Sequence, residues 1–299
     1  PKSREYMYRI ILNEKNSKPL FLLVIDNLRF DQWKVLKPKL ENLYRIEEEE
    51  LYYSILPTAT QYSRNAIFAG LMPSEIEKRF PKMWKNDEDE GGKNLYEKEF
   101  FADLLKRTGY NGKFSYNKIT NLNAGKKLSE NFNNLLNNDL NVIVYNFVDM
   151  LSHARTEMEI IKELADDESA YRSLTSTWFD HSTLLEIIEK IAEENCKLII
   201  TTDHGTVRVK DPSKVIGDRN TNTNLRYKQG RNLNYNKKEV FEIHRPEDAF
   251  LPRTNVSTSF IFAKEDMFLP IQTTLTITLI IIKIHFNMEE YPWKKCLFQ

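Results

Sequence analysis

The chain has 299 residues, with 43 basic and 43 acidic side chains and 41% hydrophobic content. This length can form one large hydrophobic core or two smaller ones. A formal net charge of zero argues against a general nucleic-acid-binding protein, which is usually basic, but leaves room for a local basic pocket. Cys196 and Cys296 are too few for a disulfide framework, and with no signal segment at the start they indicate a cytoplasmic protein.

The first half of the chain predicts alternating strands and helices. We interpret residues 1–18 as a linker or the remnant of a helix from a longer protein. A buried strand is predicted at Leu20–Asp26, because a near-continuous apolar run is typical of a parallel strand covered on both faces. A shorter strand is expected at Glu50–Leu56, and the segment Leu56–Leu71 is expected to turn and then form a short apolar helix.

The middle of the chain adds an insertion, a helix and a second buried strand. The stretch near residues 75–95 is polar and acidic, and we interpret it as a solvated loop or a lid-like insertion. Glu97–Thr108 places its apolar side chains on one helical face. Asn141–Asp149 is again a near-continuous apolar run and predicts a second fully buried strand.

The remaining elements complete the fold class. Thr175–Asn195 predicts one long helix that leads into a third buried strand at Lys197–Asp203. Asp211–Asn236 is expected to form a long surface loop, and Asn255–Ala263 a further strand. Strands that alternate with helices predict an α/β fold, with a mostly parallel central sheet flanked by helices.

Three aspartates carry the first functional signal. Asp26, Asp149 and Asp203 each end one of the three clearest predicted strands. Ligands of open α/β sheets bind beyond the carboxyl ends of the strands. A single aspartate at such a position is more often a turn residue or a helix cap. Three together, two of them with a histidine nearby, favour a metal site.

The histidines indicate which metals fit. His153 follows the second aspartate by one helical turn, and His204 directly follows the third. Ligation by aspartate together with histidine favours zinc or manganese over magnesium or calcium. His181, inside the predicted long helix, is interpreted as a core or surface residue, and His244, in a loop, is a weaker ligand candidate.

A nucleophile is expected at the start of the helix within Leu56–Leu71. Free N–H groups at a helix N-terminus favour a bound phosphate. Thr60 is preferred to Thr58 because it lies nearer the helix start, although either threonine could act only as a cap. Metal coordination would lower the pKa of such a hydroxyl and make it an alkoxide nucleophile.

The motifs together resemble a known family. The order Asp, PTxT, DxxxH and DHG resembles the alkaline phosphatase superfamily. Within that superfamily, LFLLVIDNLRFDQW, LPTATQYSRNAIFAGLMP and TTDHGT are similar to the PglZ domain, in particular to that of PorX-type response regulators of Bacteroidetes. The resemblance covers residues 5–266, and we interpret 19–266 as a catalytic domain with an alkaline-phosphatase-like fold.

The resemblance implies a metal-dependent phosphoesterase with two divalent metals, zinc being expected and manganese the alternative. One metal would be held by Asp26, Thr60, Asp203 and His204, and the other by Asp149, His153 and a third ligand near the C-terminus. Thr60 would be the nucleophile. Arg29 and Arg64 are candidate substrate contacts, and a surface or structural role is the alternative for each.

The resemblance also implies a biological setting. It suggests phosphodiesterase action on cyclic and linear oligonucleotides by the effector domain of a two-component response regulator of type IX secretion. The implied partners are the phosphodiester substrate, an upstream receiver domain, and a sigma factor or a secretion-system component. The competing interpretation is a regulatory protein-interaction module with weak or no catalysis. A third and less favoured interpretation is a cofactor-independent mutase.

The C-terminal segment 267–299 departs from the family pattern. It lacks the family's QHGGxSxEE segment, which would supply the third ligand of the second metal. Reading the codons of His285–Cys296 one nucleotide earlier permits such a segment, so we interpret the tail as a frameshift product that impairs activity. The Thr/Ile/Leu-rich stretch Pro270–Phe286 is too polar and too short for a membrane span.

Overall fold

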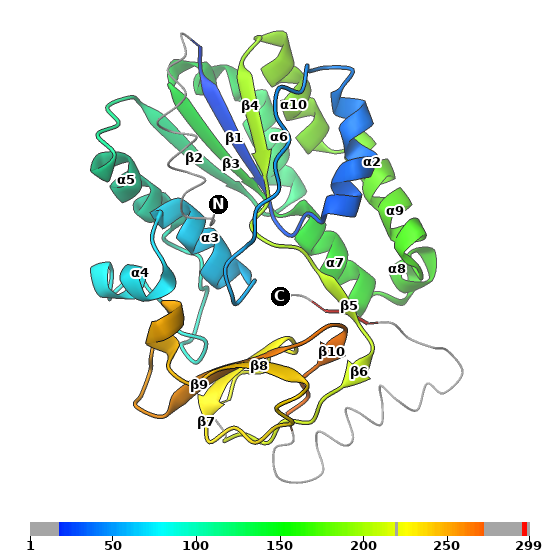
Figure 1. The fold of residues 1–299 in the computed structure, drawn as a ribbon. Helices are drawn as coiled ribbons and strands as arrows, with labels where there is room; N and C mark the ends of the chain where they lie inside the picture. Colours follow the sequence, from blue (N-terminus) through cyan, green and yellow to red (C-terminus); the bar gives the residue numbers. More distant parts are fainter. Residues whose placement is uncertain (1–17, 219–220, 272–294, 298–299) are drawn as a thin grey trace. The chain divides into compact units, whose positions relative to one another are not determined.

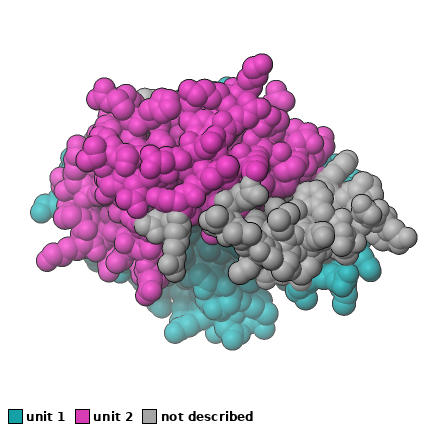
Figure 2. Space-filling model, turned by 90° about the horizontal axis from the view of Figure 1, so that it is seen from below, with its two compact units in different colours: residues 1–70, 97–205 teal, residues 71–96, 206–299 magenta. Residues whose placement is uncertain are grey.

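The computed structural model describes residues 18–218, 221–271 and 295–297. The chain divides into two compact units, coloured separately in Figure 2. Unit 1 comprises residues 1–70 and 97–205, and unit 2 comprises residues 71–96 and 206–299. The segment predicted to form a linker, 1–18, lies outside the described residues except for its last position.

Unit 1 is built on a four-stranded sheet in the order β2-β3-β1-β4, and every neighbouring pair is parallel (Figure 1). The strands are β1 (Leu20–Ile25), β2 (Phe114–Ile119), β3 (Leu140–Tyr145) and β4 (Lys197–Thr201). Ile25 pairs with Tyr145 and Val24 with Thr201, so the strands end at one edge of the sheet. Every residue of β1 and β3 is buried, as the apolar runs predicted.

Helices cover both faces of this sheet (Figure 1). They are α2 (Phe30–Leu40), α3 (Thr60–Ala69), α5 (Glu97–Arg107), α6 (Leu122–Glu130), α7 (Phe147–Glu157), α8 (Glu159–Leu164), α9 (Glu168–Asp180) and α10 (Thr183–Glu193), with a 3-10 helix η1 (Phe132–Asn137). Phe21 and Leu23 of β1 share the largest hydrophobic cluster with Leu36 of α2 and Ile187 of α10. Aromatic ring contacts pack α3 against α5 and against β2. The predicted α/β class is confirmed.

Unit 2 is a small, mainly antiparallel β structure. Its elements are α4 (Pro73–Arg79), β5 (Val207–Val209), β6 (Asp211–Pro212), β7 (Tyr227–Arg231), β8 (Val240–Ile243), η2 (Pro246–Ala249), β9 (Thr258–Ala263), β10 (Met267–Phe268) and β11 (Lys295–Leu297). A three-stranded sheet in the order β7-β9-β8 packs on a cluster that includes Val215, Ile261 and Leu269. The strand predicted at Asn255–Ala263 is therefore present, as β9, but it is antiparallel.

Three predicted strands need correction. The strand predicted as fully buried at Lys197–Asp203 ends at Thr201, and as the edge strand β4 it is only half-buried before that residue. The strand expected at Asn141–Asp149 ends at Tyr145, and Asp149 lies in the first turn of α7. Phe147 and Val148 are buried in a helical conformation, so their apolar character reflects the sheet-facing side of α7. The segment Glu50–Leu56 forms no strand, and only its position 53 makes a single bridge.

Two longer predictions are also wrong. Thr175–Asn195 is not one helix, because α9 ends at Asp180 and α10 begins at Thr183. His181 is the exposed C-cap of α9, and Ser182 caps α10 by accepting a hydrogen bond from the Leu185 N–H at 3.2 Å. Asp211–Asn236 is not a plain loop, since it contains β6 and β7.

The tail predicted to be aberrant, 267–299, is described only at residues 267–271 and 295–297. β10 pairs with β6 in parallel, and the backbone of β11 pairs with β5 in antiparallel fashion. The codons discussed for the frameshift fall mainly on residues outside the described part, so that hypothesis stays a prediction. In the described ranges, no helix combines the length and the apolar character that a membrane crossing requires.

Candidate metal centre

Two acidic side chains and one histidine converge at the carboxyl edge of the unit 1 sheet. Asp26 directly follows β1, and Asp203 and His204 follow the adjacent strand β4. The ligand atoms of these three residues lie within 4.8 Å of one another, and all three side chains are buried. His204 Nε2 is 3.6 Å from Asp26 Oδ1 and 3.7 Å from Asp203 Oδ2. The structure therefore brings together three of the residues that the sequence singled out.

Backbone donors orient the carboxylate of Asp203. Its Oδ1 accepts hydrogen bonds from the N–H of Asn27 at 3.3 Å and from the N–H of His204 at 3.0 Å. Asn27 has a φ of 64°, a left-handed conformation that asparagine tolerates, and this turns the chain sharply after β1. Because Oδ1 is held by two N–H groups, Oδ2 is left to face Asp26 and His204.

Thr60 completes the group from a different element. It is the first residue of α3, after an extended Ala59 that makes no side-chain cap. Its Oγ1 lies 2.8 Å from His204 Nε2. The helix predicted in this segment is confirmed, and the hydroxyl of Thr60 is placed at its N-terminus, where free N–H groups favour an anion.

The donor set fits a divalent metal. Atoms bound tetrahedrally to zinc at 2.0–2.1 Å are separated by roughly 3.4 Å. The three distances from His204 Nε2, to Thr60 Oγ1, Asp26 Oδ1 and Asp203 Oδ2, run from 2.8 to 3.7 Å. Asp26 Oδ1 and Asp203 Oδ2 are buried without a hydrogen-bond partner in the described part of the chain. Buried carboxylate oxygens are costly unless something binds them, which a cation at this position would do.

A buried arginine adjoins this group. Arg64, on α3, places Nη1 2.7 Å from Asp26 Oδ2 and 3.8 Å from Asp203 Oδ2. Its Nε lies 2.5 Å from Oε1 of Glu97, the first residue of α5. Glu97 also accepts hydrogen bonds from Lys118 Nζ at 2.9 Å and from the Tyr116 hydroxyl. Sequence reasoning missed Glu97, because an acidic residue in the first turn of a helix is ordinary.

The pKa of Asp26 is raised and the pKa of Glu97 is lowered. Burial, followed by the charge of Asp203, raises the pKa of Asp26 to about 6, although Arg64 and His204 act against this. Burial also acts to raise the pKa of Glu97, but Arg64 and Lys118 outweigh it and hold that pKa below its usual value. Glu97 is therefore a firmly ionised acid, whereas Asp26 is destabilised as a bare carboxylate.

Comparison with known families agrees with this geometry. Residues 7–274 match the family model described as the BREX system PglZ alkaline phosphatase-like domain. The chain belongs to the PglZ family. No curated protein matches it. The α/β fold of this PglZ domain, with its mostly parallel central sheet, is the one expected of an alkaline phosphatase-like domain.

Asp149 and His153 of the PglZ domain form a separate pair. Both lie on α7 at the i, i+4 spacing predicted, with His153 Nε2 3.7 Å from Asp149 Oδ2. The His153 side chain is 52% exposed. Burial, followed by the negative charge of Asp26, raises the pKa of Asp149. Within the described ranges, the pair belongs to no cluster of three or more potential metal ligands.

Arg29 and Arg64, the two candidate substrate contacts, are both paired with acidic side chains. Arg29 is paired with Asp31, with Nε 2.8 Å from Oδ1, and with Glu168. Arg64 is buried among the three carboxylates described above. Both arginines are thus held by acidic residues, and a role for either in substrate binding stays a prediction. His244, on unit 2, is exposed and lies 3.3 Å from Glu242.

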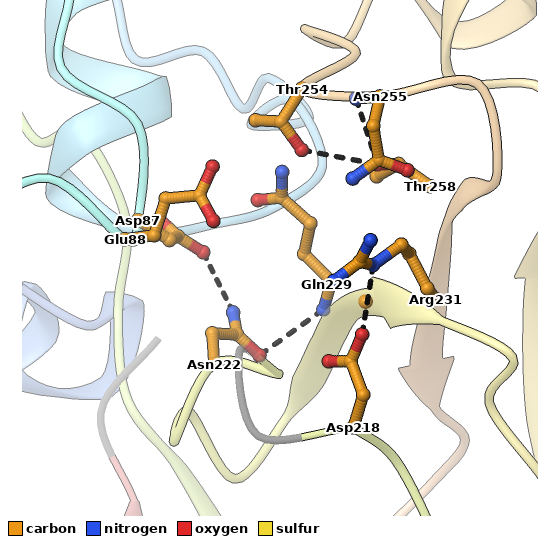
Figure 3. Close-up of a pocket in the computed structure, with 10 residues that line it drawn as sticks. Asp87, Glu88, Asp218, Asn222, Gln229, Arg231, Thr254, Asn255 and Thr258 are labelled. Carbon is orange, nitrogen blue, oxygen red and sulfur yellow. Dashed lines mark hydrogen bonds and ion pairs between the residues drawn. The ribbon is translucent and has the colours of Figure 1, made fainter.

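Unit 2 contains a polar pocket that sequence analysis did not predict (Figure 3). Asp87, Asp218 and Asn222 line it, together with Gln229 and Arg231 of β7. Asn222 donates to Asp87 at 2.7 Å, and Arg231 pairs with Asp218 at 2.9 Å, so these groups largely satisfy one another. None of the predicted catalytic or metal-binding residues lines this pocket.

Proposed function

We propose that this PglZ domain is a metal-dependent phosphoesterase with Thr60 as its nucleophile. The observation that carries the proposal is the position of the Thr60 hydroxyl, 2.8 Å from His204 Nε2 in the same group as Asp26 and Asp203. A hydroxyl beside two carboxylates and an imidazole, at the start of a helix, is suited to attack on phosphorus.

Each residue has a distinct role in this proposal. Asp26, Asp203 and His204 would hold a divalent metal together with Thr60. Such a metal supplies charge stabilisation and a lower hydroxyl pKa. The first turn of α3 presents N–H groups to the phosphoryl oxygens, and the backbone bonds to Asp203 Oδ1 keep that carboxylate in position.

The finer parts of the proposal rest on the resemblance of the motifs to PorX-type proteins. The metal would be zinc. Two metals would bind in all, and Asp149 and His153 would be ligands of the second one. The finer parts also comprise cyclic or linear oligonucleotides as substrates and a role as the cytoplasmic effector of a response regulator of type IX secretion. A receiver domain and a sigma factor or secretion-system component would be the partners.

One observation favours the alternative of a regulatory interaction module with weak catalysis. Asp149 and His153 have no third acidic, histidine or cysteine ligand close enough to share a metal in the described part of the chain. A domain that binds only one of two metals would keep the fold and lose most of its turnover.

Metal content and phosphodiester hydrolysis test the proposal together. We expect the full chain to bind zinc or manganese and to hydrolyse bis-p-nitrophenyl phosphate, and a chelator to remove both properties. Asp203→Asn should abolish metal binding and hydrolysis. Asp180→Asn is the matched control, because Asp180 is an exposed acid that pairs with Lys39, outside the acid–histidine group. Less than one bound metal, with no Thr60-dependent hydrolysis, would instead favour the interaction module.

A further inference from the structure

Arg64 connects the candidate metal centre to an acid behind it. Its Nη1 faces Asp26 Oδ2 at 2.7 Å and Asp203 Oδ2 at 3.8 Å, while its Nε lies 2.5 Å from Glu97 Oε1. The side chains of Arg64 and Glu97 are only 2% and 1% exposed. Solvent therefore screens these charges weakly, and each one strongly affects its neighbours.

Glu97 is supported from the other side. Lys118 Nζ lies 2.9 Å from Glu97 Oε2, and the Tyr116 hydroxyl donates to the same oxygen. Phe68 of α3 packs edge-on against the rings of Tyr116 and Phe101, which fixes α3 against α5 and β2. Arg64 and Glu97 are thus positioned by rigid elements, and neither of them was predicted to bind the metal.

We propose that Arg64 is an internal counter-cation of the Asp26–Asp203 pair, and that Glu97 is the positioning residue that limits how strongly Arg64 competes with a bound metal. This inference rests on the metal site of the proposed function. In the absence of a metal, the guanidinium offsets the mutual repulsion of the two carboxylates. When a divalent cation binds, Glu97 retains Arg64 and neutralises its charge.

The two residues should therefore change metal affinity in opposite directions. Arg64→Met removes a positive charge beside two ligands, so a divalent cation should bind more tightly, by about tenfold or more. Glu97→Gln keeps the shape but removes the negative charge that offsets Arg64, so the same cation should bind about tenfold or more weakly. The double variant removes both charges and should lie within about threefold of the wild type.

A purely structural ion pair predicts a different pattern. Loss of either partner would then leave an uncompensated buried charge and loosen α3 against α5. Both single variants would bind metal more weakly and unfold at lower temperature, and neither would gain affinity. The sign of the Arg64→Met effect consequently separates the two interpretations.

The experiment measures zinc affinity on the full chain by competition with a chromogenic chelator, without any activity assay. Circular dichroism and thermal unfolding of the metal-free proteins establish that each variant is folded. Arg64→Lys keeps the positive charge and should stay closer to the wild type than Arg64→Met. Should Arg64→Met fail to fold, Arg64→Gln removes the same positive charge and decides the sign in its place.

The outcomes distinguish this inference from the proposed function. If Asp26→Asn leaves zinc affinity unchanged, the metal site itself is wrong. If Asp26→Asn abolishes binding, but Arg64→Met weakens it or leaves it unchanged, the metal site stands and the counter-cation role is wrong. Tighter binding in Arg64→Met together with weaker binding in Glu97→Gln supports the inference.

Discussion

The Thr60 hydroxyl and His204 Nε2 lie 2.8 Å apart although 144 residues separate them in the chain. This contact leads to the most direct prediction. Thr60→Ala should reduce phosphodiester hydrolysis by a factor of about 10³ or more, because it removes the attacking oxygen. Thr60→Ser keeps a hydroxyl and should retain a substantial part of the rate. Steady-state hydrolysis of bis-p-nitrophenyl phosphate measures both.

Thr58 provides the matched control for this prediction. It lies in the same segment, two residues before the first residue of α3. Thr58→Ala should therefore change the rate less than tenfold, as a cap or loop residue would. Equal losses in Thr58→Ala and Thr60→Ala, or full activity in Thr60→Ala, would contradict the assignment of the nucleophile.

Metal binding should stabilise the folded chain measurably. The ligand group forms only in the folded state, so zinc at a hundred times its Kd should add about 2.7 kcal/mol to the free energy of unfolding. The increase in Tm should disappear in His204→Ala, because one of the three converging ligands is lost. His244→Ala is the control, since His244 is exposed on unit 2. An unchanged zinc effect in His204→Ala would exclude this site.

The Asp149–His153 pair should contribute less to metal retention. His153 is half exposed, and in the part of the chain that the structure describes the pair has no third acidic, histidine or cysteine side chain close enough to share a metal. We expect the purified chain to retain about one metal per molecule, and His153→Ala to leave that metal in place. Elemental analysis after gel filtration measures this stoichiometry. Two metals that survive gel filtration, with one lost in His153→Ala, would show that the second site is complete.

Continuous apolar runs made three strands of the sheet, β1, β3 and β4, predictable, and with them the positions of Asp26 and Asp203. The edge strand β2 was not predicted, because its sequence FSYNKI is mostly polar and half-buried. β1 and β3 are buried on both faces, so nearly every position is apolar, and the residues that follow β1 and β4 necessarily meet at one edge. The end of β3 was harder to predict, because Phe147 and Val148 are buried whether the chain continues as a strand or begins α7. Asp149 was consequently assigned to a strand end when it lies in a helix.

Contacts between distant segments were not predictable from the sequence. The ion pair between Arg64 and Glu97 depends on how α3 packs against α5, and neither local spacing nor composition specifies that packing. Apart from β9, the strands of unit 2 were missed for a related reason. They are short, and β7 has the polar sequence YKQGR, so their pairing depends on tertiary packing rather than on a strong apolar pattern.

The break between α9 and α10 gives a stability prediction. Ser182 accepts from the Leu185 N–H at 3.2 Å and donates to the Phe179 carbonyl at 2.8 Å, so it begins one helix and closes the other. Ser182→Ala should lower the free energy of unfolding by about 1 kcal/mol. Ser173→Ala, at an exposed position within α9, should be neutral or slightly stabilising. Urea unfolding of both variants checks this, and equal effects would rule out the capping role.

Lys228 on β7 makes the stability of unit 2 depend on pH. Its side chain is fully buried and donates only to the backbone carbonyls of Asn222 and Asn224, with no acidic partner in the described residues. Burial lowers its pKa from 10.5 to about 7. Below pH 7 the lysine is protonated in both states, and the folded state bears the full cost of the buried charge. Between about pH 7 and 10.5 the unfolded chain binds more protons, so the stability contribution of Lys228 rises with pH.

Comparison with Lys228→Met isolates this contribution. Relative to the variant, the wild type should gain on the order of 3–5 kcal/mol of unfolding free energy between pH 6 and pH 10.5. Lys237→Met, at a position 76% exposed, should show no such gain because its charge stays in water. Urea titrations at several pH values measure the difference. A wild-type-to-variant difference that stays constant with pH would mean that Lys228 is solvated and charged in the folded protein.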